Sequence, residues 1–254
     1  MKITFLGTGT SQGVPIIGCT CEVCRSLDYR DKRLRTSAYI EADGKRLIID
    51  TGPDFRQQML RENISHLDAV LFTHAHRDHT AGLDDIRAFN FLQEMDMPTY
   101  ATVEVLRQLE HDFEYIFSKQ PYFGLPRLAT HEIGTLPFTI GPLSIQPLPV
   151  MHLRLPVMGF RIGNFSYITD ANHIPDSTLE LMRGTSVLVL NALQIGEHLS
   201  HFNLAQALEM VEKIKPVKAY FTHISHKLGL HSKVEQQLPP HVQLAYDGLE
   251  IQTD

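Results

Sequence analysis

The chain has 254 residues, which suits one large domain or two small ones, and 43% of them are hydrophobic, enough to bury a core without disulfides. The net charge is -6, from 23 Lys and Arg against 29 Asp and Glu, so no overall positive field attracts nucleic acid or an anionic membrane. All three cysteines lie between Cys19 and Cys24, which excludes a secreted disulfide framework. With no signal peptide and no apolar run of membrane-spanning length, we expect a cytoplasmic protein with neither a membrane nor a nucleic acid as partner.

Runs of β-forming residues alternate with amphipathic stretches along the chain. The expected strands cover residues 2–6, 37–42, 46–50, 69–73, 143–150, 158–162, 165–170, 187–191, 219–222 and 243–246. The expected helices cover residues 55–62, 84–92, 103–110, 176–182 and 204–214. Gly44 and Gly163 mark hairpin turns. No repeat or low-complexity linker divides the chain, so we expect residues 1–254 to form a single α/β domain with mixed sheet and helices outside.

A cluster of metal-ligand residue types follows the apolar run at residues 69–72, in the segment His74-Ala75-His76-Arg77-Asp78-His79. Imidazole nitrogens bind zinc, iron or manganese, and carboxylates suit the harder ions of this group. Loops at the carboxyl ends of strands are where α/β folds place catalytic groups. His74 and His76 can converge on one ion, while Asp78 and His79 can serve a second.

Three further residues of these types follow expected strands, namely His152, Asp170 and His223. A lone histidine at such a place is more often a hydrogen-bonded core residue than a metal ligand. Their coincidence with the histidine-rich loop favours the metal interpretation, which rests on the density of the pattern rather than on any single residue.

These residues resemble the H-x-H-x-D-H signature and later ligands of the metallo-β-lactamase fold superfamily. The opening at residues 7–15 and the closing segments at residues 222–226 and 246–248 are similar to its phosphodiesterase branch, above all to the phosphodiesterases of the carbon–phosphorus lyase (phosphonate breakdown) pathway. The resemblance implies an αββα sandwich of two mixed β-sheets flanked by helices. It also implies a dinuclear site at one edge of the sheets, with two divalent ions, zinc or manganese, and with Asp170 as the bridging carboxylate.

Such a site predicts a hydrolase of small phosphodiesters, cyclic ones included. Two ions about 3.5–4 Å apart acidify a shared water, and the bridging hydroxide attacks phosphorus. Asp78 would bind metal and orient this nucleophile. His201, just before the helix that Asn203 caps, is the candidate general acid, and the resemblance supports this choice over the nearby His198. The alternative is that His201 is an ordinary histidine of a surface loop.

A second cluster, Cys19-Thr20-Cys21-Glu22-Val23-Cys24, brings three thiols together. With His226 as fourth ligand, they predict a structural zinc site that ties this loop to the C-terminal part of the chain. The alternative is three reduced thiols or a redox pair.

Two weaker signals and several alternatives remain. Arg33 and Arg35 are expected on a solvated edge, with contact to a substrate phosphate as the alternative, and Asp247 is a candidate hydrogen-bond partner of a ligand histidine. The rival activities are a tRNA 3′-processing endonuclease and a hydrolase of thioesters or lactams on the same fold. A further alternative for the function is a non-catalytic zinc-bound scaffold. For the oligomeric state, a homodimer is an open alternative.

Overall fold

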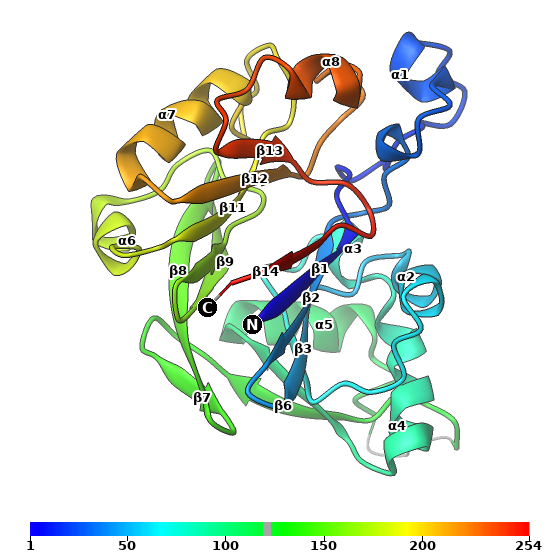
Figure 1. Cartoon of the computed structure of the whole chain (residues 1–254). Helices are drawn as coiled ribbons and strands as arrows, with labels where there is room; N and C mark the ends of the chain where they lie inside the picture. The colour runs from blue at the N-terminus through cyan, green and yellow to red at the C-terminus, as the bar shows by residue number, and fades with distance from the viewer. Residues whose placement is uncertain (119–122, 254) are drawn as a thin grey trace.

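The computed structural model describes residues 1–118 and 123–253, in which two seven-stranded mixed sheets lie face to face and helices cover both outer surfaces (Figure 1). This arrangement confirms the predicted αββα sandwich. The two chain ends lie together in the first sheet, where the Met1 amino group donates to the Thr253 carbonyl oxygen at 2.7 Å. Over the same residues, no helix is long and apolar enough to cross a membrane.

The first sheet has the order β14-β1-β2-β3-β4-β5-β6. From β14 to β3 the neighbours are antiparallel, and from β3 to β6 they are parallel. The strands are β1 (Lys2–Gly7), β2 (Ser37–Ala42), β3 (Lys45–Ile49), β4 (Ala69–Leu71), β5 (Met97–Ala101), β6 (Leu128–Glu132) and β14 (Glu250–Gln252).

The second sheet has the order β13-β12-β11-β10-β9-β8-β7 and is built in the same way. From β7 to β10 the neighbours are antiparallel, and from β10 to β13 they are parallel. The strands are β7 (Phe138–Ile140), β8 (Leu143–His152), β9 (Leu155–Ile162), β10 (Phe165–Tyr167), β11 (Val187–Asn191), β12 (Lys218–Thr222) and β13 (Val242–Leu244).

Helices α2, α4 and α5 lie outside the first sheet, and α6, α7 and α8 lie outside the second (Figure 1). Helix α1 sits apart from both layers, in the loop that contains the cysteines. The helices are α1 (Glu22–Arg25), α2 (Phe55–Arg61), α3 (Arg77–Thr80), α4 (Arg87–Gln93), α5 (Val103–Asp112), α6 (Asp176–Leu181), α7 (Leu204–Ile214) and α8 (His231–Glu235), with short 3₁₀ turns at Tyr29–Asp31 and Leu83–Ile86.

Alternating strand residues fill the layers on both sides of each sheet. In β3, Leu47 and Ile49 pack between the sheets, whereas Ile48 faces the helices of the first layer. In the second sheet, Val189 faces inward and Leu188 packs against the helices outside. Because side chains of a strand point alternately to its two faces, both faces of each sheet are buried, which explains the nearly continuous apolar runs in the sequence.

Four strands end earlier than the sequence predicts, including two that lead into the region of the predicted ligands. The expected strand at 69–73 ends at Leu71, and the expected strand at 165–170 ends at Tyr167. There the backbone leaves the ladder and bonds to side chains instead: the Thr73 amide donates to Asp50 Oδ1 at 2.8 Å. Strand ends that give up ladder bonds free their side chains to converge above the sheet edge.

Candidate metal centre

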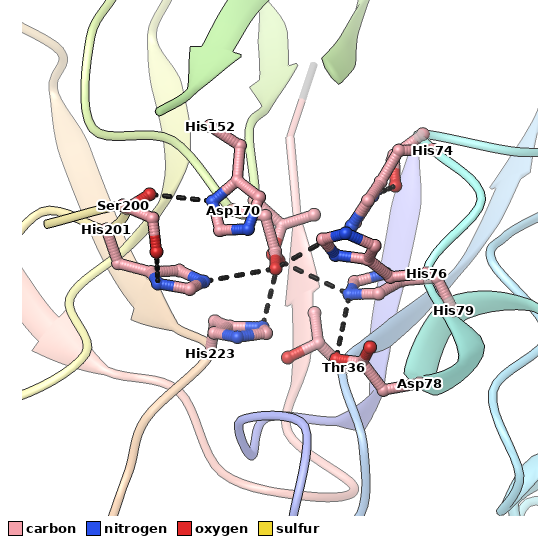
Figure 2. Close-up of polar contacts among 12 residues, drawn as sticks. Thr36, His74, His76, Asp78, His79, His152, Asp170, Ser200, His201 and His223 are labelled. Atoms are coloured by element: carbon pink, nitrogen blue, oxygen red, sulfur yellow. Dashed lines mark hydrogen bonds and ion pairs between the residues drawn. The ribbon is translucent and has the colours of Figure 1, made fainter. Parts of the chain in front are cut away.

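The predicted catalytic ligands converge where the carboxyl ends of strands from both sheets meet (Figure 2). The first sheet contributes the loop from β4 into α3, and the second contributes the last residue of β8 and the residues after β10 and β12. The seven residues brought together are His74, His76, Asp78, His79, His152, Asp170 and His223.

Asp170 lies at the centre of this arrangement and shares its carboxylate between two groups of ligands. Its Oδ1 lies 3.3 Å from His79 Nε2 and 2.9 Å from His223 Nδ1, a group that Asp78 completes. Its Oδ2 lies 3.8 Å from His74 Nε2, in a second group with His76. In each group the ligand atoms lie within 4.8 Å of one another, so the geometry suits two neighbouring ions that share Asp170.

His152 lies beside these groups, with its ring centroid 5.2 Å from that of His76. Its Nδ1 donates to the Ser200 carbonyl oxygen at 2.7 Å, which leaves Nε2 free as a ligand atom. His152 forms a possible ligand group with Asp170 and His201, but it does not belong to the group of His74 and His76. His152 is therefore close to the second group without completing it.

Buried nitrogens without partners test whether these residues fit a metal. His74 Nε2 and His79 Nε2 are buried and make no hydrogen bond, although Asp170 oxygens lie 3.8 Å and 3.3 Å away. The other nitrogen of each ring is occupied, with His74 Nδ1 2.9 Å from Thr73 Oγ1 and His79 Nδ1 2.7 Å from Asp50 Oδ2. A buried polar atom left unsatisfied costs about 1–3 kcal/mol, and a divalent ion ligated by these nitrogens removes that cost. The residues present thus fit a metal centre.

Opposite charges balance within the site. Burial lowers the pKa of His74 well below its usual range, which keeps that ring neutral. Burial has the same tendency at His79, but the nearby carboxylates of Asp170, Asp50 and Asp78 raise the pKa of His79 well above its usual range. Burial alone would raise the pKa of Asp170, yet the surrounding imidazoles lower it strongly. The ionised carboxylates and the protonated His79 ring stabilise each other, and a bound cation would supply that positive charge in place of the ring proton.

Asp50 is a residue of the site that the sequence analysis did not identify. Its carboxylate is fully buried and accepts hydrogen bonds from the Thr73 amide and hydroxyl at 2.8 Å each, and it contacts His79 Nδ1. A carboxylate on the second ring nitrogen fixes the orientation of a ligand histidine. The usable signal was its place directly after the buried strand β3, the same pattern that identified Asp170.

Three residues of the site have positive φ angles that favour glycine. Asp50, Asp170 and His223 have φ values of 64°, 52° and 54°. Such conformations cost about 1–3 kcal/mol each in non-glycine residues and gather at functional sites. Here they turn the chain sharply at the strand ends, so that the side chains face one another.

His201 is buried, with 9% of its surface exposed, and is therefore not an ordinary histidine of a surface loop. Its Nε2 lies 3.2 Å from Asp170 Oδ2, and its ring stacks on that of His223 at 4.9 Å and 13° (Figure 2). Its Nδ1 lies 3.1 Å from Ser200 Oγ and 3.2 Å from His198 Nδ1. Burial lowers the pKa of His201 below its usual value.

The helix after His201 begins as the sequence predicts. Asn203 caps α7 by accepting from the Gln206 amide at 2.9 Å, and Gln206 Oε1 accepts from the Asn203 amide at 3.0 Å. This reciprocal capping box fixes the chain direction at the start of the helix. The loop that contains His201 is thereby held against the metal ligands.

The three cysteines and His226 also come together, although the histidine lies far from the cysteines in the sequence. His226 Nδ1 lies 3.3 Å from the Sγ atoms of Cys19 and Cys21 and 3.6 Å from that of Cys24. The four ligand atoms lie within 4.8 Å of one another, and the cysteines are not joined by a disulfide. Hydrogen bonds from the Cys24 amide, and then His226, lower the pKa of Cys21 to about 6. Three sulfurs and one imidazole nitrogen suit a tetrahedral zinc.

Two weaker expectations were wrong. Asp247 does not contact a ligand histidine: its carboxylate accepts from Thr8 Oγ1 at 2.8 Å and from the Leu34 amide at 2.7 Å. Arg33 does not lie on a solvated edge, because only 4% of its surface is exposed and it donates to the Ala245 carbonyl oxygen at 2.6 Å. In the sequence, these two residues look like part of a charged strand edge and of an Asp-Gly turn. In the structure, they belong to a buried polar network.

Comparisons with known proteins agree with this geometry. A family model described as a beta-lactamase superfamily domain matches residues 45–224. The octanoyltransferase of Porphyromonas gingivalis is 42% identical over 100% of this chain and 52% of its own length, so the chain spans about half of that protein. The coenzyme PQQ synthesis protein B of Methylobacterium nodulans is 34% identical over 34% of each chain.

Solved structures give likenesses over the full length. A structure described as a new diphosphatase from the PhnP family has a TM-score of 0.93 and 41% identity, covering 100% of this chain and 98% of that one. The zinc-bound PqqB of Methylobacterium extorquens has a TM-score of 0.79 at 19% identity, covering 100% of both chains, and shows the shared fold alone. The matched domain, the two sheets and the likeness to a PhnP-family diphosphatase together show that the chain belongs to the metallo-β-lactamase superfamily.

Proposed function

We propose that this chain is a dinuclear metal-dependent hydrolase of small phosphodiesters, cyclic ones included. The observation that carries the proposal is the position of His201, a buried imidazole whose Nε2 lies 3.2 Å from the carboxylate that both ligand groups share. A proton donor beside a paired-metal site suits the departure of an alkoxide, which leaves poorly without a proton. The likeness to a diphosphatase, an enzyme acting at phosphorus, supports the same reaction class.

Each residue has a distinct task in this proposal. Asp78, His79 and His223 would hold one ion, His74 and His76 the other with His152 beside them, and Asp170 would bridge the two. When bound, two divalent ions supply an acidified water as nucleophile and neutralise charge on the phosphoryl oxygens. Asp78 would also orient the nucleophile.

His201 would then transfer its Nε2 proton to the departing oxygen. Stacking on His223 and contacts of Nδ1 with Ser200 and His198 fix the plane of its ring. The pKa of His201 is lowered by burial, which makes the protonated ring a stronger acid. A third ion, zinc, would be held by the three cysteines and His226 for stability rather than chemistry.

A panel of substrates tests the reaction class. We expect the manganese- or zinc-loaded enzyme to hydrolyse bis(p-nitrophenyl) phosphate and a 2′,3′-cyclic nucleotide. Precursor tRNA should be a poor substrate because the net charge of -6 offers no general attraction to RNA. An octanoyl thioester represents the rival acyl chemistry, which the name of the half-matched Porphyromonas gingivalis relative suggests. A higher kcat/KM for the thioester or for tRNA than for the small diesters would overturn the proposal.

The variant His201→Ala tests the proton donor. We expect a loss of kcat of roughly 10²–10⁴-fold with an alkyl-alcohol leaving group, the usual contribution of general acid catalysis. The loss should be much smaller with p-nitrophenolate, which needs no proton. Metal content should be unchanged, and His111→Ala, at an exposed histidine outside the site, is the control. Equal losses with both leaving groups would remove His201 from this role.

A further inference from the structure

A cavity opens beside the metal ligands, between helix α5 and the hairpin of β8 and β9. It has a volume of about 530 Å³, within the range of small-molecule sites, and His74 and His76 form part of its wall. The remaining wall is mostly apolar and includes Ala75, Val105, Pro149, Leu155, Val157 and Met158. The reaction centre therefore continues directly into an apolar space.

Four polar side chains at this cavity, namely Arg77, Thr102, Gln108 and Asp112, have partners within the chain. Gln108 Nε2 donates to Asp112 Oδ1 at 3.0 Å, and Thr102 accepts from the Val105 amide at 3.5 Å. Arg77 lies 3.6 Å from Asp112 Oδ2, with its guanidinium 5.2 Å from the centre of the Phe113 ring. A ligand with many polar atoms would bury them here without partners, which is costly.

Charge at the cavity also disfavours a second phosphate. Its lining contains the carboxylates of Glu104 and Asp112 and a single cation, Arg77, which Asp112 already engages. Away from His74 and His76, an anion would meet two carboxylates and one cation that is already engaged, whereas a neutral apolar group would replace water against an apolar wall.

We propose that this cavity binds a hydrocarbon substituent of the substrate, an unbranched alkyl or acyl chain, while the phosphoryl group lies at the metal ligands His74 and His76. The inference rests on the proposed function and narrows its substrate class. The phosphodiester would have one polar end at the metals and one apolar arm running toward α5. The length of the apolar arm, rather than its hydrogen-bonding pattern, would then determine which substrates the enzyme prefers.

A homologous series of substrates tests this directly. The substrates are methyl, butyl and octyl p-nitrophenyl phosphate, with p-nitrophenolate as the common leaving group. We expect kcat/KM to rise roughly two- to fourfold per added methylene, the gain for partial to full burial of each group. A kcat/KM that is flat along the series would overturn the inference.

Binding without turnover separates this inference from the proposed reaction. Calorimetric titration with methyl-, butyl- and octylphosphonate should give dissociation constants that fall along the same series. Equal constants for methyl- and octylphosphonate would overturn the cavity assignment whatever the turnover. Length-dependent binding in an enzyme that cleaves no phosphodiester would support the cavity and reject the proposed reaction.

The variant Leu155→Glu places a charge in the wall of the cavity at a side chain that is already 38% exposed, so folding should tolerate it. In this variant, both kcat/KM and the dissociation constant should depend less on the length of the alkyl group. Leu60→Glu, an exposed leucine on α2 outside the cavity, is the matched control and should keep the wild-type dependence. A nucleoside phosphonate that binds more tightly than octylphosphonate, and loses that advantage in Leu155→Glu, would assign the cavity to a base instead.

Discussion

The two clusters of ligand residues differ in what holds them in place. The histidine–aspartate cluster stands on strand ends of both sheets, and Asp170, His79 and His223 are nearly fully buried beside the main core. The cysteine cluster lies in the loop between β1 and β2, whose own apolar contacts are limited to a small group around Val14 and Val23. The first site is positioned by the sheets, so an ion there is free to serve chemistry. The second lies in a loop with few apolar contacts of its own, so an ion there would serve the fold.

The variant Asp170→Asn should have the largest effect on turnover. It keeps the shape of the side chain but removes the charge that both ligand groups share. We expect kcat/KM to fall by a thousandfold or more, since loss of a single transition-state contact already costs roughly 10²–10³. Metal analysis should show loss of catalytic ions with the cysteine-bound ion retained. Wild-type metal content and turnover would contradict the shared role of Asp170.

Asp50→Asn should have an intermediate effect on the same site. The buried carboxylate contacts His79 Nδ1 at 2.7 Å, and removal of such a partner typically costs 10–100-fold in metal affinity or activity, so we expect a loss of about that size. Titration with manganese and steady-state kinetics measure the two quantities. Asp43→Asn, at an exposed turn, is the control. If both variants behave as wild type, Asp50 does not orient the ligand.

Cys21→Ser should separate the two clusters. We expect metal content to fall from three ions per chain to two, while kcat/KM stays within about threefold of wild type because the sheets position the catalytic ligands. Limited proteolysis should cut residues 13–32 faster, since the loop loses its link to His226. A variant that keeps three ions would contradict the structural zinc. A wild-type protein that holds only two ions and has freely titrating thiols would contradict it as well.

His231→Gln should leave turnover at neutral pH nearly unchanged and alter acid stability. His231 lies at the base of the cysteine region, where its amide donates to Asp31 at 2.8 Å and its Nδ1 lies 3.1 Å from Arg33 Nη2. Burial, and then the positive charges of Arg33 and Arg30, lower the pKa of His231 to about 4.

The sign of the pH effect follows from that pKa. Between about pH 6.5 and 4 the unfolded chain binds a proton at His231 and the folded chain does not, so stability falls as the pH falls. The loss from pH 7 to pH 5 is up to about 2 kcal/mol. Urea unfolding at both pH values should show this loss in wild type and a smaller one in His231→Gln. Equal losses of stability from pH 7 to pH 5 in the two proteins would show that folding does not shift the pKa of His231.

The convergence of the predicted ligand residues was predictable because their signal is local and repeated. Each follows an apolar run, and strand ends of parallel sheet meet at one edge. Asp50 shows the same signal, but it lies outside the H-x-H-x-D-H segment and the later ligands that carry the resemblance, so it was not identified. The strands β5, β6, β7 and β14 were not predicted, since these short segments have mixed burial, as in Met97–Ala101 with its internal proline.

Long-range polar contacts were beyond the sequence pattern for a physical reason. Arg33 and His231 are 198 residues apart, and Asp247 meets the Leu34 amide across 213 residues. Charged residues on the surface and in a buried network have the same composition, and only the folded arrangement separates them. The apolar cavity likewise combines residues from α5, the metal-ligand loop and β8–β9, which no spacing rule connects.

The position of the candidate metal centre between the two sheets has a thermodynamic consequence. His74 to His79 belong to the N-terminal sheet and Asp170 and His223 to the C-terminal one, so an ion ligated by both bonds the halves of the chain together. Any ion that binds only the closed sandwich adds about 1.4 kcal/mol of stability per tenfold rise in its free concentration above the dissociation constant. Free metal in the surroundings would thus regulate how long the protein survives as well as how fast it works.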